Sequence, residues 1–97
     1  MPVIPEEFEW DEGNAEKNKA KHDVEIKECE EVFMNIPRII WRDKKHSTTE
    51  ERFIILGKTN IGRGLHVIYT VRHEKIRVIS ARDQNKKERS LYASQKN

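Results

Sequence analysis

The chain has 97 residues, of which 37% are charged and 35% hydrophobic, so it can bury one small core, and we expect a single domain over residues 1–97. A single cysteine, Cys29, excludes an internal disulfide. The lack of an export signal or of ~20 consecutive apolar residues predicts a cytoplasmic protein without membrane contact. The net charge of +2 is unevenly spread: residues 1–50 hold 8 Lys and Arg against 13 Asp and Glu, and residues 51–97 hold 11 against 4.

The acidic first half predicts one short strand and two helices. Phe8–Trp10 is typical of a strand, and Asp11 is a good N-cap for a helix over Asp11–His22. That helix has a weak apolar face. The second helix, Glu25–Met34, is amphipathic because its apolar residues recur at steps of three and four, so it should cover a sheet. The first helix instead carries a polar stripe of Asn14, Asn18, Lys21 and His22.

The basic half predicts a sheet and a final helix. Pro37 ends the second helix, and the polar stretch Asp43–Thr49 is typical of an exposed loop. Turn residues at Asn60–Gly64 and at His73-Glu74 separate the later strands. The strands are expected over Arg38–Arg42, Arg52–Lys58, Leu65–Arg72 and Lys75–Arg82, with Arg52–Lys58 central in the sheet.

Two finer expectations concern the end of the chain. Alternation in the last strand predicts one face formed by Ile76, Val78, Ser80 and Arg82. Asp83 should cap a basic helix over Gln84–Ser94. The order β-α-α-β-β-β-β-α therefore predicts an α+β fold, with two N-terminal helices packed on an antiparallel β-meander and a C-terminal helix after it.

Three arginines stand where strands begin, turn or end: Arg52, Arg63 and Arg82. A guanidinium group binds phosphate oxygens in bidentate fashion and stabilises the charge of a pentacoordinate transition state. RNA carries its own nucleophile, the 2′-hydroxyl, so a protein needs only a base, an acid and this charge stabilisation. Glu51 or His22 could serve as the base. No phosphate-binding loop, metal-ligand spacing or nucleophile elbow occurs, so we expect no cofactor and no metal.

Each of these features also has a non-catalytic explanation. In this alternative interpretation, Arg52 and Arg63 are solvated surface groups, and Lys21-His22 is the basic end of a helix. Tyr92 is explained as the anchor of the terminal helix. The two oppositely charged halves can simply complement each other within one fold. The alternative function is a non-catalytic basic module that binds nucleic acid or an acidic protein.

Short motifs along most of the chain, taken in their order and spacing, resemble those of the BrnT toxins. They extend over about residues 7–92. The motifs are Phe8-Glu9-Trp10-Asp11, Asn18, Lys21-His22 with Val24, Glu30-Glu31-Val32-Phe33, Glu51-Arg52-Phe53 with Gly57, Val67-Ile68-Tyr69-Thr70, Ile76-Arg77-Val78-Ile79-Ser80-Ala81-Arg82, and Lys87-Glu88-Arg89 with Leu91-Tyr92.

This resemblance implies a fold similar to that of RelE-type toxins and a ribonuclease that cleaves RNA without a metal. The implied partner is a BrnA-type antitoxin with a ribbon-helix-helix domain, and the toxin would reach operator DNA only through it. Two positions depart from the family: Asp23 replaces a glycine and Asn14 a lysine. The motifs assign catalysis to Lys21, His22, Glu51, Arg52, Arg63 and Arg82, and we expect Arg77, Lys87, Arg89 and Tyr92 to bind RNA.

Overall fold

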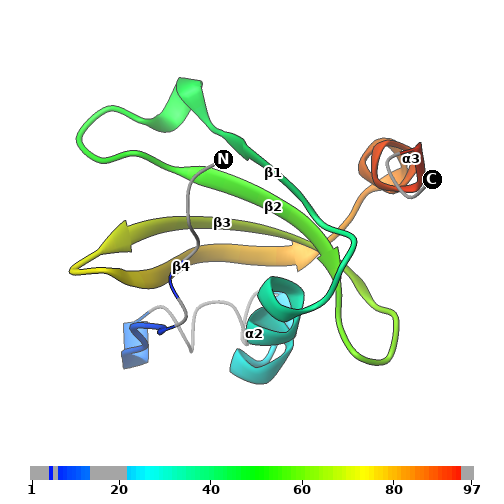
Figure 1. Ribbon diagram of the computed structural model, residues 1–97, viewed down its shortest axis with the longest axis horizontal. Coiled ribbons are helices and arrows are strands. Elements are labelled where there is room, and N and C mark those ends of the chain that lie inside the picture. The colour runs from blue at the N-terminus through cyan, green and yellow to red at the C-terminus, as the bar shows by residue number, and fades with distance from the viewer. Residues whose placement is uncertain (1–4, 6, 14–21, 95–97) are drawn as a thin grey trace.

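The structure, a computed structural model, describes residues 5, 7–13 and 22–94. Of the helices that are described from end to end, α2 precedes a four-stranded sheet and α3 follows it (Figure 1). A short 3-10 helix, η1, lies in the connection between the first two strands. The elements are α2 (Ile26–Met34), β1 (Ile39–Arg42), η1 (Lys44–His46), β2 (Phe53–Lys58), β3 (Gly64–Arg72), β4 (Lys75–Asp83) and α3 (Lys86–Ser94).

The region before α2 departs from the prediction. The predicted helix over Asp11–His22 falls mainly on residues 14–21, which lie outside the described residues. Glu12, Gly13 and His22, at the two edges of that stretch, are helical, but α2 is the one helix before the sheet that is described from end to end, and not the expected pair. Asp23 has a φ of 53°, the left-handed conformation that glycine adopts without strain. Aspartate tolerates this conformation better than most residues, which fits its presence where the resemblance implies a glycine.

The predicted strand over residues 8–10 is reduced to one parallel bridge, between Phe8 and Ile76. The Glu9 amide donates to the Ile76 carbonyl, and the Ile76 amide donates to the Glu7 carbonyl, each at 2.8 Å. Because the segment reaches β4 at this one residue, it does not continue as a strand of the sheet.

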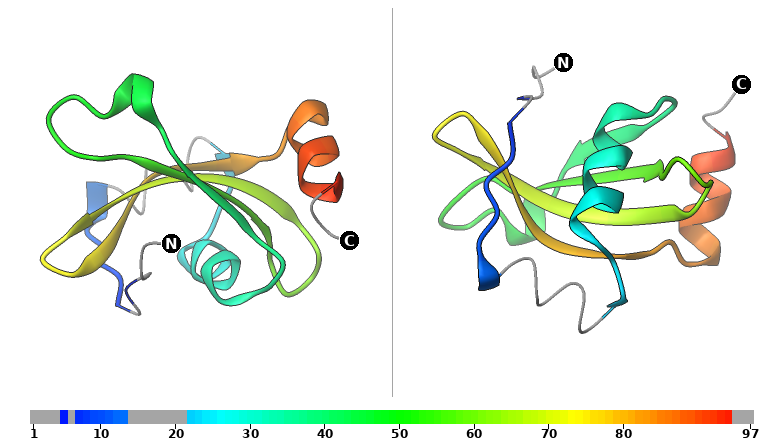
Figure 2. Two further views of the ribbon diagram at one scale, coloured as in Figure 1. Left: turned by 45° about the horizontal axis from the view of Figure 1, so that its top comes forward. Right: turned by 90° about the horizontal axis from the view of Figure 1, so that it is seen from below.

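The four main strands form an antiparallel meander in the order β1-β2-β3-β4, as predicted. His73 and Glu74, between β3 and β4, have φ values of 51° and 61°. Two left-handed residues in this position give a turn that matches the twist of the strands. Figure 2 shows that twist, with α2 across one face of the sheet. The antiparallel meander is therefore confirmed.

The apolar side of α2 forms the core with that face. Cys29, Val32 and Phe33 are buried, and the Phe33 ring meets the Tyr69 ring edge-on at 4.9 Å. Gly57 in β2 lets the helix approach, because a Cβ atom there would lie 2.9 Å from Cγ1 of Val32. Burial raises the pKa of the Cys29 thiol to about 12, so this side chain packs as an apolar group and is not a nucleophile.

A β-bulge in β4 decides which way the end of that strand faces. The pairing with β3 shifts by one residue at Ile79. Up to Val78 the even-numbered residues are buried on the core side of the sheet, whereas beyond the bulge Ala81 is buried there and Arg82 faces the opposite side. The extra residue reverses the alternation. The prediction of one face formed by Ile76, Val78, Ser80 and Arg82 is therefore wrong.

The last helix, α3, packs at one end of the sheet. The Tyr92 hydroxyl donates to the Pro37 carbonyl at 2.6 Å and ties the helix to the segment that leads into β1. Asn85, not the predicted Asp83, caps α3: its Oδ1 accepts from the Glu88 amide at 2.8 Å, and Glu88 Oε1 accepts from the Asn85 amide at 2.9 Å. Asp83 instead ends β4. Among the described residues, no helix is long and apolar enough to cross a membrane.

Candidate functional site

Arg82 and His66 lie opposite each other on β4 and β3, on the face of the sheet remote from α2. Glu88, in the first turn of α3, reaches both. Arg82 donates through Nη1 and Nη2 to the two carboxylate oxygens of Glu88 at 2.8 and 2.9 Å. The His66 Nε2 atom lies 3.5 Å from Oε2 of Glu88. We refer to His66, Arg82 and Glu88 as the Arg82 cluster.

The Arg82 guanidinium keeps one edge outside these bonds. A third N–H group donates to the Asp83 carbonyl at 3.0 Å, so three of five N–H groups are used. The remaining two, Nε–H and the second Nη2–H, share the other edge and have no acceptor among the described residues. The side chain as a whole is 34% exposed, so it is in contact with solvent. Two parallel donors are the geometry that binds phosphate.

The acid–base groups of the cluster favour their unprotonated forms at neutral pH. Burial lowers the pKa of His66, and the positive charge of Arg82 lowers it further, although Glu88 opposes this. The hydrogen bond from Arg82 is the main reason why the pKa of Glu88 is lowered. The cluster thus combines a cation with two proton acceptors.

The Glu88 ion pair predicts a loss of stability in acid. Because the pKa of Glu88 is lower in the folded chain than its ordinary value of 4.5, the stabilisation is complete above pH 4.5 and disappears as the pH falls through the folded-state pKa. Urea unfolding between pH 7 and pH 3 should show that the free energy of unfolding falls in acid, and this decrease should be smaller in Glu88→Gln. Glu74→Gln, on the β3–β4 turn, should show the same decrease as the wild type. An equal decrease in the wild type and in both variants would contradict the prediction.

Arg63, in the turn before β3, uses all five N–H groups within the protein. Nε and Nη2 donate to the Asp83 carboxylate at 2.7 and 3.2 Å. Nη1 donates to Glu28 at 3.0 Å and to the Asp23 carbonyl at 2.9 Å, and Nη2 also donates to the His22 carbonyl at 3.2 Å. No N–H group remains for a phosphate. These contacts favour a positioning role, in which Arg63 joins the segment before α2 to the end of β4.

The structure brings some of the predicted catalytic residues to one end of the sheet. Arg63 holds His22 near Asp83, the residue that follows Arg82. Lys21 precedes His22 in the chain but lies outside the described residues. This end of the sheet therefore carries His22, Arg63 and Arg82, with Arg63 on the α2 side and Arg82 on the other.

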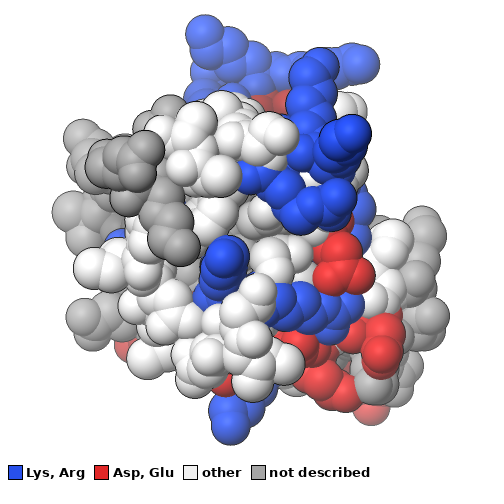
Figure 3. Space-filling view, turned by 90° about the vertical axis from the view of Figure 1, so that its right-hand side faces the viewer, with Lys and Arg blue, Asp and Glu red and all other residues white. Residues whose placement is uncertain are grey.

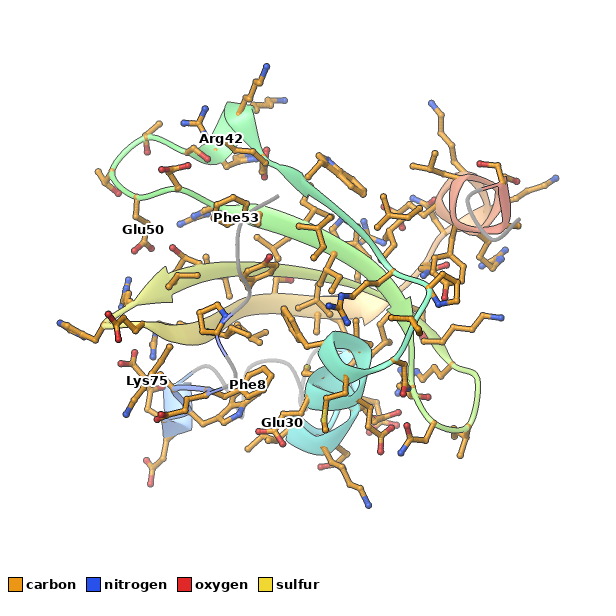
Figure 4. All side chains as sticks on the ribbon, viewed as in Figure 1. Phe8, Glu30, Arg42, Glu50, Phe53 and Lys75 are labelled. Atoms are coloured by element: carbon orange, nitrogen blue, oxygen red, sulfur yellow. The ribbon has the colours of Figure 1, made fainter. Side chains whose placement is uncertain are left out.

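Glu51 and Arg52 lie toward the other end of the sheet. Leu56, four residues beyond Arg52, is level with His66, so at a rise of ~3.3 Å per residue Arg52 is roughly 13 Å from the Arg82 cluster along the strands. Glu51 pairs with Arg42 at 3.2 Å. Figure 4 labels Arg42 and Glu50 at the end remote from α3. Glu51 and Arg52 therefore do not converge with Arg82.

The predicted RNA-binding residues are also divided. Arg77 lies near Arg52, where Glu9 and Asp11 bind its Nη1 at 3.1 and 2.9 Å. On α3, Lys87 and Arg89 are at least partly exposed, and Figure 3 shows Lys and Arg side chains gathered in the upper half of this end of the molecule. Tyr92 is only 5% exposed, which favours its role as an anchor over stacking on a base.

Comparison with known families identifies the chain. A model of the ribonuclease toxin BrnT of type II toxin–antitoxin systems matches residues 10–88, which is most of the 97 residues. The chain belongs to the BrnT family. A comparison with curated proteins finds no match. The match of the toxin to its family extends from Trp10 to Glu88, so it contains the whole Arg82 cluster. Membership of a type II system gives the toxin an antitoxin partner.

Two members of the cluster, His66 and Glu88, are not among the predicted site residues. Glu88 has a visible signal: it follows Asn85 by three residues, which is the spacing of a capping box. A carboxylate fixed at the start of α3 lies close to the end of β4. His66 has no comparable signal, because only the register of β3 against β4 brings it to Arg82.

Proposed function

We propose that the toxin is a metal-independent endoribonuclease that cleaves RNA by attack of the 2′-hydroxyl, and that Arg82 binds the phosphate at the cleaved bond. This proposal rests on the edge of the Arg82 guanidinium that has no acceptor among the described residues. A bidentate cation at this place can bind the phosphate and stabilise the additional negative charge of its transition state. Arg63, which has used all its donors, positions the backbone of His22 and Asp23 at the same end of the sheet.

In the proposed reaction, the 2′-oxygen attacks phosphorus while the Glu88–His66 pair accepts the hydroxyl proton. The bond to the 5′-oxygen breaks, and Lys21 or His22 returns a proton to that leaving oxygen. The products are a 2′,3′-cyclic phosphate and a 5′-hydroxyl. Because the pKa values of His66 and Glu88 are both lowered, both groups are unprotonated at neutral pH, as a general base must be.

The remaining predicted residues fit a longer path for RNA over the sheet. Glu51 and Arg52 lie roughly 13 Å from the cluster, so we place them, with Arg77, along the neighbouring nucleotides and not at the cleaved bond. Lys87 and Arg89 add positive charge near α3. We further propose a cytoplasmic toxin whose antitoxin is of the BrnA type, with a ribbon-helix-helix domain that carries the pair to its operator.

The expected result of incubating the toxin with RNA in excess chelator is cleavage at the rate seen with Mg²⁺. Metal independence follows because Arg82 supplies the charge that a metal would otherwise supply. Gel analysis gives the rate, and end-labelling identifies the cyclic phosphate and the 5′-hydroxyl. Cleavage that stops in chelator would contradict the mechanism. RNA that stays intact but bound in a salt-dependent manner would support the non-catalytic basic module.

A further inference from the structure

Two adjoining cavities lie where α3 meets the turn after β2 and the connection from α2 to β1. Their volumes are about 410 and 260 Å³, and they share Lys58 and Tyr92. Ile36 and Asn60 also line the larger cavity, and Arg89 lines the smaller. Figure 1 shows these segments together at one end of the molecule. We call the two cavities the α3 groove. The groove is formed by these connections, by α3 and by the adjoining strand ends at Lys58 and Gly64, and no residue of the Arg82 cluster lines it.

The rim of the α3 groove carries the most exposed large apolar side chains of the described residues. Ile36 is 82% exposed, Ile61 is 87% exposed and Met34 is 75% exposed, whereas the next is 43% exposed. Ile36 lines the groove, and the other two adjoin the lining residues Asn35 and Asn60. The Asn35 side chain donates through Nδ2 to Asn60 Oδ1 at 2.9 Å, so the two sides of the rim are held together. Gathered apolar side chains of this kind mark protein interfaces.

The charge in the α3 groove is positive. Lys58 and Arg89 line it, and no Asp or Glu is among its described lining residues. Lys58 Nζ lies 5.8 Å from the centre of the Tyr92 ring, and Arg89 donates to the Gln84 carbonyl at 2.8 Å. Neither cation has a carboxylate partner among the described residues, in contrast to the ion-paired Arg63, Arg72, Arg77 and Arg82. The nearby carboxylate of Glu31 binds the Asn60 amide.

We infer that the α3 groove is the docking surface of the antitoxin, and that the docking segment combines apolar side chains with acidic ones. The inference rests on the type II partnership that family membership gives the toxin. An acidic group matches Lys58 and Arg89, and apolar groups match the rim at Ile36 and Ile61. An RNA strand would match the cations but would leave the aliphatic rim in water, so a protein segment is favoured.

The test measures the affinity of the full-length toxin for the antitoxin encoded with it, by calorimetry. The double variant Ile36→Asp/Ile61→Asp should bind about 100-fold more weakly, because two apolar contacts are lost and two negative charges face an acidic segment. Both side chains are more than 80% exposed, so the fold should be kept, and circular dichroism checks this. Val71→Asp, at an exposed position near the β3–β4 turn, is the matched control and should bind as the wild type does.

RNA cleavage by the same variants, without antitoxin, separates this inference from the proposed ribonuclease. Weakened antitoxin binding with unchanged cleavage supports the docking surface. If even the wild type cleaves no RNA, the ribonuclease proposal fails, but weakened antitoxin binding by the double variant still supports the docking surface. Wild-type affinity for the antitoxin in the folded double variant would overturn the inference. Slower cleavage together with that wild-type affinity would identify the groove as an RNA subsite instead.

Discussion

Arg82→Ala is expected to slow RNA cleavage by about a thousandfold. Removing one preorganised charge donor from a transition state typically costs ~10²–10³ in rate, and Arg82 is proposed to supply two parallel donors. The loss should appear in the cleavage step under single-turnover conditions. The same measurement on Glu88→Gln should show a smaller loss, because the cation remains while one proton acceptor is neutralised.

Two variants make the Arg82 result specific. Arg82→Lys keeps the charge but loses the paired donors, so an intermediate rate is expected. Arg72→Ala removes another arginine that is bound in bidentate fashion, by Glu50 at 3.0 and 3.1 Å, but at the turn end of β3, and its cleavage rate should equal that of the wild type. Wild-type cleavage by folded Arg82→Ala would remove Arg82 from the mechanism. Equal losses in Arg82→Ala and Arg72→Ala would indicate a general effect of charge.

The strands and their order were predictable because their signals are local. Alternating and continuous apolar runs mark β2 and β3, and the turn residues between them leave room only for antiparallel neighbours. The amphipathic pattern of α2 likewise predicts which side faces the core: Cys29, Val32 and Phe33 are its buried residues. Each of these inferences depends on residues within one element. Such inferences are robust because one face must be buried whatever the rest of the chain does.

The face of Arg82 was not predictable, because it depends on one unpaired residue. The turn pairs Arg72 with Lys75, and uninterrupted pairing from there would set His66 opposite Ala81. The bulge at Ile79 shifts that register by one and sets His66 opposite Arg82. A polar face with a cation and an imidazole is created by this shift. Nothing in the alternation of the sequence marks it.

The role of Arg63 could not be predicted either, since its partners come from distant segments of the chain. Arg63 was expected to act on RNA. Instead, all its N–H groups donate to acceptors within the protein, on residues up to 41 positions away. In the sequence, Arg63 is an arginine at a turn flanked by glycines. The acceptors around it come together only in the fold.

Arg63→Ala is therefore expected to lower the free energy of unfolding by about 2–3 kcal/mol, which makes it the largest stability effect that we predict. Removing one partner of a buried ion pair costs ~3–5 kcal/mol, and this is reduced here because Asp83 is largely exposed and recovers water. Glu28 is only 20% exposed, and it loses its cation inside the fold. Urea unfolding, monitored by tryptophan fluorescence, measures the change.

Arg63→Lys distinguishes charge from geometry at this position. A lysine keeps the positive charge but cannot reach Asp83, Glu28 and the two carbonyls at once, so some of the stability should be lost. The two variants should also slow cleavage in proportion to this loss, since Arg63 is proposed to position the Lys21-His22 segment. A folded Arg63→Ala that cleaves as fast as the wild type would show that the segment needs no such support. Arg63 holds the two sides of the sheet's end together, so stability and cleavage are expected to fall together here, whereas Arg82→Ala should affect cleavage far more than stability.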